Sequence, residues 1–234
     1  MIKENIKKVK DIIAETCIKC NRKTEDITVV AVSKTFDTAK IIEAYENGLK
    51  NFGENYVQEF LKKHEELSNK KDIKWHFIGH LQTNKIKHIY DKVHLLHTLD
   101  SIKLAEKLNN TLKKNNKVLN ALIQINIGED PNKYGINKEE ITKFLDKVSS
   151  FKNLKIKGLM TITPFFDNPE KVRPFYREMK KIFDKVFNYS ADNIEIKELS
   201  MGMTNDFHIA IEEGATIIRI GTAIFGKREY SKER

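Results

Sequence analysis

The sequence is poor in cysteine, proline and glycine and has no long apolar run, and each shortage excludes a class of protein. Its 234 residues include two cysteines, four prolines and ten glycines. No proline-rich linker or low-complexity tract divides the chain, which favours a single domain over residues 1–234. No stretch approaches the roughly 20 apolar residues that span a bilayer, and Met1 opens an amphipathic pattern instead of a signal peptide. We therefore expect a cytoplasmic protein without a membrane partner.

The two cysteines, Cys17 and Cys20, have the Cys-x-x-Cys spacing of redox motifs. In a redox protein this spacing follows a strand and opens a helix, because the helix dipole lowers the pKa of the first thiol. Here both cysteines lie late in a helical pattern. The apolar positions of that pattern are Ile2, Ile6, Val9, Ile12, Ile13 and Cys17. Packing or surface thiols are the favoured interpretation, and without a second cysteine pair we expect no metal site.

The formal net charge is +9, from 42 Lys and Arg against 33 Asp and Glu. Such an excess favours phosphorylated ligands or nucleic acid. Lysines are interspersed with glutamates, as in residues 62–66, and no basic block carries interleaved aromatic residues. We expect a solvated, lysine-rich surface that attracts phosphate, and no nucleic-acid partner.

Short apolar runs and amphipathic stretches alternate along the whole chain. The eight predicted strands are Val29–Ser33, Asn51–Gly53, Lys74–Ile78, Lys92–His97, Val118–Asn126, Lys155–Thr161, Glu195–Ser200 and Thr216–Ile220. The seven predicted helices that lie between them are Thr38–Asn47, Val57–Leu67, Gln82–Tyr90, Ile102–Lys114, Lys138–Ser149, Pro169–Tyr189 and Asp206–Glu213. A leading helix that begins near Ile2 is available to cover the remaining gap, because eight strands have only seven helices between them.

Eight strands that alternate with helices through short connections favour a closed parallel barrel. The predicted fold class is α/β, a single (β/α)8 TIM barrel with an extra N-terminal helix. An open doubly wound sheet is the alternative, but it usually has about five or six strands and a Gly-x-Gly-x-x-Gly turn after the first one. Ser33-Lys34-Thr35 stands at that position here, so the barrel is the preferred interpretation.

Lys34 directly follows the first predicted strand. Residues 27–33, which precede it, are almost all apolar. A run of this kind is typical of a strand covered on both faces. Burial disfavours the charged form of an amine, so a lysine at the edge of a dry interior can lose its proton near neutral pH and attack an aldehyde to form a Schiff base. A lysine whose ammonium group reaches water is the alternative.

Chemistry in a barrel of this kind belongs where strands end and helices begin. Candidate residues lie at the ends of six predicted strands and would meet on one face: Lys34, Asn55, His76, Met160, Thr161, Ser200, Arg219 and Gly221. This convergence favours a reactive role for the lysine over a solvated one.

Glycine-containing corners follow the last two predicted strands. Gly202 allows a tight turn, after which Met203 and Thr204 offer backbone N–H groups and a hydroxyl at the start of a helix. Gly221 and Thr222 repeat the arrangement one strand later. Two such corners form a phosphate cradle at a position that is frequent in these barrels, although a turn alone would explain either glycine.

Arg219 lies inside the last predicted strand, so its guanidinium points into the barrel mouth or into the helix layer and needs a partner. A permanently charged donor beside a heteroaromatic nitrogen would keep that nitrogen unprotonated. A structural ion pair with Glu198 or Glu54 is the alternative.

A reactive lysine, a double phosphate corner and a cationic ring partner together describe a site for pyridoxal 5′-phosphate (PLP). The chain closely resembles the pyridoxal phosphate homeostasis protein family, whose members are single-domain relatives of the alanine racemase barrel. The matching segments span almost the whole chain in order: residues 31–35 (AVSKT), 52–59 (FGENYVQE), 75–79 (WHFIG), 81–85 (LQTNK), 158–161 (GLMT), 199–203 (LSMGM) and 219–226 (RIGTAIFG).

The resemblance implies a role for each candidate residue. Lys34 would carry PLP as a Schiff base, and Arg219 would face the pyridine nitrogen. The residues that would surround the phosphate are Ser200, Thr204, Gly221 and Thr222. The residues that would line the ring pocket are Asn55, His76 and Met160.

Three other positions bear on the resemblance. Lys133 looks like a lysine that the family places near a loop linked to cofactor release. His80 departs mildly from the proline of many relatives, and Thr204 replaces a frequent serine but keeps the hydroxyl.

The resemblance also implies a function in vitamin B6 homeostasis with little catalysis. Alanine racemase takes its second base, a tyrosine, from an additional carboxyl-terminal domain, whereas only residues 227–234 follow Gly226 here. The site should also stay open to solvent. We therefore expect a monomeric carrier or buffer that binds PLP reversibly and supplies PLP-dependent apoenzymes.

Two other functions remain open at this point. A PLP-dependent amino-acid racemase could use Lys34 as one base and His76 or Tyr56 as the other. A barrel that binds another phosphorylated metabolite, with RNA on its basic surface, is the third hypothesis.

Overall fold

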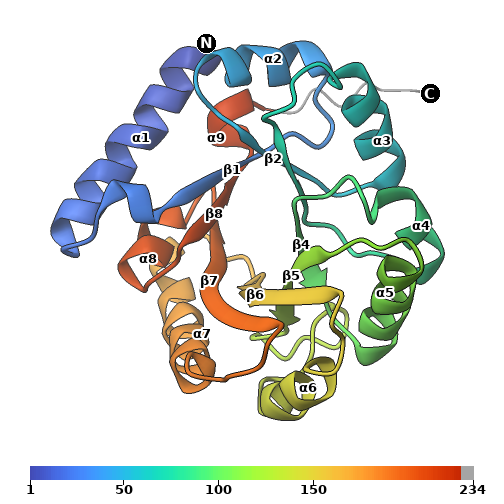
Figure 1. Ribbon diagram of the computed structural model, residues 1–234. Helices are drawn as coiled ribbons and strands as arrows, with labels where there is room; N and C mark the ends of the chain where they lie inside the picture. The colour runs from blue at the N-terminus through green and yellow to red at the C-terminus, as the bar shows by residue number, and fades with distance from the viewer. Residues whose placement is uncertain (228–234) are drawn as a thin grey trace.

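Eight parallel strands close into a barrel in chain order, so that β1 pairs with both β2 and β8 (Figure 1). The computed structural model describes residues 1–227. The predicted single domain of residues 1–234 extends beyond this range and stays a prediction. The strands are β1 (Thr28–Val32), β2 (Asn51–Glu54), β3 (Lys74–Phe77), β4 (Leu95–Leu99), β5 (Leu119–Ile125), β6 (Leu154–Thr161), β7 (Ile194–Met203) and β8 (Ile217–Ile220).

Helices form a ring around the strands (Figure 1), which confirms the (β/α)8 prediction. The α-helices of residues 1–227 are α1 (Ile2–Lys19), α2 (Thr38–Glu46), α3 (Val57–Glu66), α4 (Ile86–Ile89), α5 (Ile102–Lys114), α6 (Ile141–Val148), α7 (Arg173–Val186), α8 (Phe207–Glu212) and α9 (Thr222–Phe225). Short 3-10 helices in the same range are η1 (Thr24–Asp26), η2 (Thr83–Lys85), η3 (Lys138–Glu140) and η4 (Pro169–Val172). None of the helices within residues 1–227 is both long enough and apolar enough to cross a membrane.

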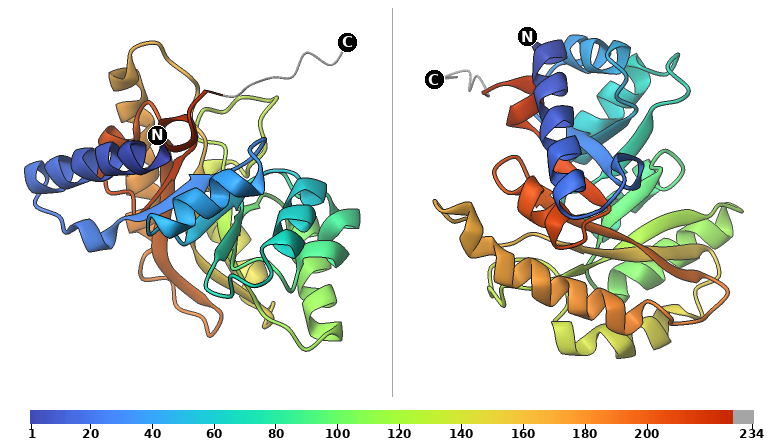
Figure 2. Two further views of the ribbon diagram at one scale, coloured as in Figure 1. Left: turned by 90° about the horizontal axis from the view of Figure 1, so that it is seen from above. Right: turned by 90° about the vertical axis from the view of Figure 1, so that its left-hand side faces the viewer.

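The extra N-terminal helix α1 packs on the outside of the barrel against α2, α8 and α9, as the right-hand view of Figure 2 shows for the last two. The Asn5 side chain donates to the Ile224 carbonyl of α9 at 3.0 Å. This contact helps to fix the helix over the seam between β8 and β1, the remaining gap that the sequence predicted it to cover. The apolar face is confirmed except at Ile12, which is 41% exposed.

The helical interpretation of Cys17 and Cys20 is confirmed, since both residues lie at the end of α1. Cys17 is buried and Cys20 is half-buried, and both are free thiols. Burial raises the pKa of Cys17, which lowers its thiolate fraction and its nucleophilic reactivity. These features favour the packing interpretation.

The barrel encloses an apolar core of its own, separate from the larger core between strands and helices. Buried side chains from β1, β4, β5, β6 and β8 form this inner cluster: Val30, Leu95, Leu122, Met160 and Ile217. Inward and outward side chains alternate along each strand. The interior is therefore packed with side chains, and ligand access is expected only at an end of the barrel.

The predicted strand order is correct, but the start of β4 and the end of β7 each lie three residues after the predicted boundary, and one helix was not predicted. Strand β4 begins at Leu95 because the backbone still turns after α4, with the Val93 N–H donating to the Ile89 carbonyl at 3.2 Å. Strand β7 continues past the predicted end at Ser200 to Met203. The short helix α9 was not predicted, because its four residues are too few to show helical periodicity.

Gly158 of β6 is a position where only glycine fits, and we predict a large cost for Gly158→Ala. Its φ is +154°, and a Cβ there would lie 1.8 Å from the Glu198 carbonyl oxygen of β7. We expect the free energy of unfolding to fall by roughly 3 kcal/mol or more. Gly226→Ala is the matched control, because its φ is +87° but a Cβ meets nothing within 4 Å. The control should lose only about 1 kcal/mol in urea unfolding, and equal losses would contradict the steric explanation.

Candidate functional site

Lys34 lies at the carboxyl end of β1, half-buried, in a turn with Ser33 and Thr35. The Ser33 N–H donates to the Gly53 carbonyl at 3.0 Å, and the Phe36 N–H donates to the Ser33 carbonyl at 3.1 Å. Thr35 has a φ of +70°, a conformation that β-branched residues rarely adopt. Such strain persists only where the surrounding structure enforces it. The neighbours of this turn must therefore hold it in place.

A buried Glu–Lys–Glu network holds the turn. Lys63 of α3 is 4% exposed, and its Nζ donates to the Ser33 carbonyl at 2.7 Å. The same Nζ donates to Glu54 Oε1 at 2.7 Å and to Glu59 Oε1 at 2.6 Å. The Ser33 hydroxyl donates to Glu54 Oε1 at 2.6 Å, and the Thr35 N–H donates to Glu59 Oε1 at 2.5 Å. The backbone on both sides of the candidate lysine is thus fixed by β2 and α3.

Glu54 is the most buried member of this network, with no exposed surface and no partner on Oε2. Burial raises the pKa of Glu54, and the nearby charge and hydrogen bond of Lys63 oppose that rise. A buried charge that loses its partner is strongly destabilising. Lys63 was not predicted as a site residue, although its i,i+4 spacing from Glu59 and its place three residues after Phe60 can be read from the sequence.

Thr204, Gly221 and Thr222 meet at the mouth, as the sequence predicted for the two corners. The Gly221 N–H donates to Thr204 Oγ1 at 3.3 Å, and the Thr222 hydroxyl donates to the same oxygen at 3.5 Å. Thr204 is half-buried and Thr222 is exposed. Two hydroxyls and a backbone N–H next to the start of a helix suit an anionic group.

Asp206 fixes the backbone of the corner after β7 through a hydrogen bond. The Met203 N–H donates to Asp206 Oδ1 at 2.7 Å, and the hydroxyl of buried Tyr176 donates to the same oxygen at 2.9 Å. The Met203 amide, which the sequence placed at the phosphate, is therefore already bonded within the protein. Its contribution to the corner is to fix the backbone that presents Thr204.

Arg219 is 5% exposed and has neutral hydrogen-bond acceptors. Its Nη1 donates to Ser200 Oγ at 2.7 Å and its Nη2 donates to the Thr161 carbonyl at 2.8 Å. The predicted alternative of an ion pair is wrong within residues 1–227. Glu198 accepts instead from the Thr216 hydroxyl at 2.7 Å, and Glu54 belongs to the Lys63 network. A buried cation whose described hydrogen-bond acceptors include no carboxylate suits an electron-rich ligand atom.

His76 and Ser200 lie deeper in the barrel than the mouth. Ser200 has no exposed surface and bonds to Arg219 and His97, and His76 is 3% exposed with a partner on each ring nitrogen. Burial lowers the pKa of His76 to about 3, so its imidazole is neutral at physiological pH. His97 was missed in the sequence, although it lies two residues after inward-facing Leu95, on the same strand face.

Asn55 and Met160 are the remaining residues predicted to line the ring pocket. Asn55 follows β2, is half-buried and has a buried Oδ1 without a partner. It borders a cavity of about 320 Å³ between the segments after β2 and β3. Met160 has no exposed surface and belongs to the inner apolar cluster. Asn55 therefore lies at the rim, whereas Met160 belongs to the floor.

Lys133 and His80 connect loops at the same end of the barrel. Lys133 Nζ donates to the Thr163 carbonyl at 3.4 Å, which joins the segments after β5 and β6. The His80 ring stacks on Tyr134 with centroids 3.6 Å apart, and its Nδ1 lies 2.9 Å from Asp100 Oδ2. His80 thus provides both a ring contact and a polar contact between these loops.

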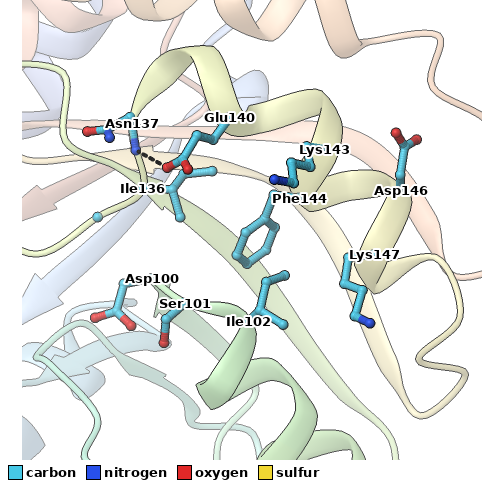
Figure 3. A pocket seen from close by; sticks show the side chains of 11 residues that line it. Asp100, Ser101, Ile102, Ile136, Asn137, Glu140, Lys143, Phe144, Asp146 and Lys147 are labelled. Carbon is cyan, nitrogen blue, oxygen red and sulfur yellow. Dashed lines mark hydrogen bonds between the residues drawn. The ribbon is translucent and has the colours of Figure 1, made fainter.

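A cavity of about 790 Å³ lies outside the barrel, and none of the predicted site residues lines it. It runs between the start of α5 and the face of α6, where Ile102 and Phe144 approach each other (Figure 3). Glu140 accepts from the Asn137 N–H at 3.4 Å at its rim. This cavity is therefore separate from the candidate site at the carboxyl ends of the strands.

Comparison with known proteins first defines the class. A family model described as alanine racemase, N-terminal domain, matches residues 2–229. The chain that forms this barrel thus belongs to the class of the alanine racemase N-terminal domain.

Full-length relatives then define the family. The pyridoxal phosphate homeostasis protein of Aquifex aeolicus is 43% identical over 227 residues, which cover 97% of this chain and 98% of that protein. The protein of the same name from Haemophilus influenzae is 38% identical over 231 residues, covering 98% and 97%. PipY of Synechococcus elongatus, solved with PLP bound, superposes with a TM-score of 0.84 at 30% identity over 97% of this chain and 100% of its own. The chain belongs to the pyridoxal phosphate homeostasis protein family, as its motifs predicted.

We predict that Lys63→Met destabilises the protein because it leaves Glu54 buried without its cation. The free energy of unfolding should fall by about 3 kcal/mol, less the part that Glu54 recovers by taking up a proton. Lys62→Met is the control, since that side chain is 78% exposed and should change stability by less than about 0.5 kcal/mol. Urea unfolding at pH 7 measures both, and similar small changes would argue against the network.

The buried histidines predict that acid weakens the fold. The folded-state pKa of His76 lies below its ordinary value of 6.5, so the unfolded chain takes up protons first. Neutral His76 contributes its full amount to the free energy of unfolding above about pH 6.5. This contribution decreases as the pH falls toward 3, with a slope of up to about 1.4 kcal/mol per pH unit. Urea unfolding between pH 7 and 5 should show a shallower slope in His76→Leu than in wild type. Exposed His88→Gln should keep the wild-type slope, and equal slopes in all three proteins would contradict the assignment.

Proposed function

We propose that this protein binds PLP reversibly through Lys34 and acts in intracellular PLP homeostasis as a carrier or buffer. One observation carries the proposal: buried Arg219, with neutral partners, lies at the same barrel end as half-buried Lys34 and the Thr204–Gly221–Thr222 corner. A cation for the ring nitrogen, donors for the phosphate and an amine for the aldehyde are the groups that PLP requires. The PLP-bound structure of PipY and the name of the Aquifex relative support it.

PLP supplies an aldehyde that condenses with an amine, forming a C=N bond and releasing water, and an aromatic ring that withdraws electrons. Lys34 Nζ is the amine in this proposal, held by a turn that its neighbours fix. Arg219 would donate a hydrogen bond to the ring nitrogen and keep it unprotonated. The Thr204 and Thr222 hydroxyls and the Gly221 N–H would hold the phosphate. Asn55 borders the ring, with its orphan Oδ1 available to a donor.

Ser200, His76, Met160 and Met203 act indirectly in this proposal. Ser200 and His76 support Arg219 from the barrel interior, Met160 forms the floor, and Met203 fixes the β7 corner. This assignment differs from direct contact with the phosphate or ring because each of these groups is buried or already bonded within the protein.

The geometry favours binding over racemisation. A racemase needs a second base on the opposite side of the substrate from the lysine. His76 cannot take this role, because both of its nitrogens are bonded in the barrel interior and its pKa is about 3. Tyr56, the other candidate, is 60% exposed, and nothing holds its ring over the mouth in the described contacts.

The proposed setting is the cytoplasm, where the protein acts as a monomer and passes PLP to apoenzymes that require it, without binding nucleic acid. Lys133 supports a reversible exchange, because it ties the loop after β5 to the Thr163 carbonyl after β6 at the barrel mouth. Movement of this contact would open the mouth without disturbing the strands.

The test is chemical trapping of the cofactor. Purified protein is mixed with PLP and treated with borohydride, and peptide mass spectrometry locates the added mass. We expect one modified lysine, Lys34, and loss of both the label and the absorption band of bound PLP in Lys34→Ala. Lys62→Ala, at an exposed helix position, should behave as wild type. Unlabelled wild-type protein, or a label that persists at other lysines in Lys34→Ala, would refute the proposal.

A further inference from the structure

Five side chains form a continuous hydrogen-bonded chain through the barrel, here called the interior polar chain: Arg219, Ser200, His97, His76 and Asn51. Beyond the 2.7 Å bond from Arg219 to Ser200, the Ser200 Oγ lies 3.0 Å from His97 Nδ1. His97 Nε2 lies 2.9 Å from His76 Nδ1, and His76 Nε2 lies 3.1 Å from Asn51 Oδ1. Asn51 opens β2, whereas Arg219 lies near the carboxyl end of β8. The interior polar chain therefore runs from the mouth toward the opposite end of the barrel.

The two ends of the interior polar chain fix its direction. A guanidinium can only donate, and an amide oxygen can only accept. Ser200 must then donate its proton to His97 Nδ1, His97 must donate from Nε2 to His76, and His76 must donate from Nε2 to Asn51. The reverse direction would require a donor at Asn51 Oδ1. Both histidines are therefore Nε2–H tautomers.

The charge of the interior polar chain stays on Arg219. Burial lowers the pKa of His76 to about 3 and that of His97 well below its ordinary value, and positive charge on Arg219 contributes at His97. Other charged or titratable groups that lower these values are His94 and Lys74. Neutral histidines keep the same tautomers across the physiological pH range.

The direction of the chain makes Ser200 a better acceptor. A hydroxyl that donates its own proton onward becomes a stronger acceptor for the next group, because successive hydrogen bonds polarise one another. Within residues 1–227, Arg219 donates to Ser200 and to the Thr161 carbonyl, and a guanidinium has five N–H groups. These two hydrogen bonds fix the plane of the Arg219 guanidinium. Its other N–H groups are then available to a ligand.

We propose that His97 and His76 are positioning residues for Arg219: through Ser200 they orient the guanidinium as a donor to the PLP ring nitrogen. This inference rests on the proposed function. It assigns a role in cofactor retention to residues that lie below the mouth and do not touch the ligand. The interior polar chain is thus the lower half of the cofactor site.

The first test needs no cofactor. Long-range proton–nitrogen NMR on protein labelled at histidine with ¹⁵N reports the tautomer of each ring. We expect Nε2–H signals for His76 and His97 that stay unchanged between pH 5.5 and 8.5. An Nδ1–H tautomer at His97 would reverse the direction of the interior polar chain and overturn the inference.

The second test measures retention of PLP in matched variants. His97→Phe keeps a ring of similar size and removes both hydrogen bonds, and Ser200→Ala removes the acceptor with little change of volume. His94→Phe is the control, because the exposed His94 ring lies 5.7 Å from His76 without a hydrogen bond to it. We expect a shifted absorption maximum of bound PLP and roughly tenfold faster release in His97→Phe and Ser200→Ala, and wild-type values in the control.

The double variant separates a connected chain from two independent packing effects. If Ser200 and His97 act as one unit, the double variant should release PLP no faster than the worse single variant. The inference would be overturned if the two single substitutions multiplied their effects on the release rate in the double variant. It would also be overturned if PLP-loaded variants kept the wild-type spectrum and release rate. In both cases the proposed function would stand. Failure of wild type and His94→Phe to bind PLP would instead refute the proposed function, and this inference with it. Thermal unfolding of each variant identifies any that do not fold, and Ser200→Ala then decides the outcome.

Discussion

A buried guanidinium with neutral partners is the constraint on which this site depends. Arg219 is 5% exposed, and its described acceptors are a hydroxyl and a backbone carbonyl. A permanent charge in a barrel interior must be solvated by protein dipoles, because water is excluded and desolvation is expensive. Ser200 and Thr161 provide these dipoles from β7 and β6. Asp206 acts on this charge through space without a hydrogen bond to it among the described residues, so the guanidinium is suited to an electron-rich ligand atom.

Burial has different consequences for Lys63 and Lys34. Lys63 is buried and its charge is balanced by Glu54 and Glu59, so it serves as a structural cation. Lys34 is half-buried at the strand end, in a turn whose Thr35 has an unusual positive φ. The structural lysine holds the turn that carries the candidate reactive one. The position of Lys34 is therefore set by β2 and α3 as much as by its own strand.

The site combines a fixed floor with a mouth made of loops. The strands place Arg219 and its supporting side chains in a packed interior, where small movements are resisted. The loops after β3 and β5 meet through the stacked rings of His80 and Tyr134, and Lys133 bonds across to the loop after β6. Loops open at lower free energy than packed strands. Such a division suits a protein that must hold a cofactor and also release it.

Local sequence patterns were enough to predict the alternation of strands and helices, the closed barrel and the convergence of Lys34, Thr204 and Gly221 at one end. These features follow from local periodicity and from the rule that parallel strands bring their carboxyl ends together. The hydrogen-bond partners of the polar groups depend on the tertiary structure. Arg219 bonds to Ser200 and not to an acidic residue, and His76 faces inward, because hydrogen bonds between strands far apart in sequence depend on strand tilt and register, which local patterns do not encode.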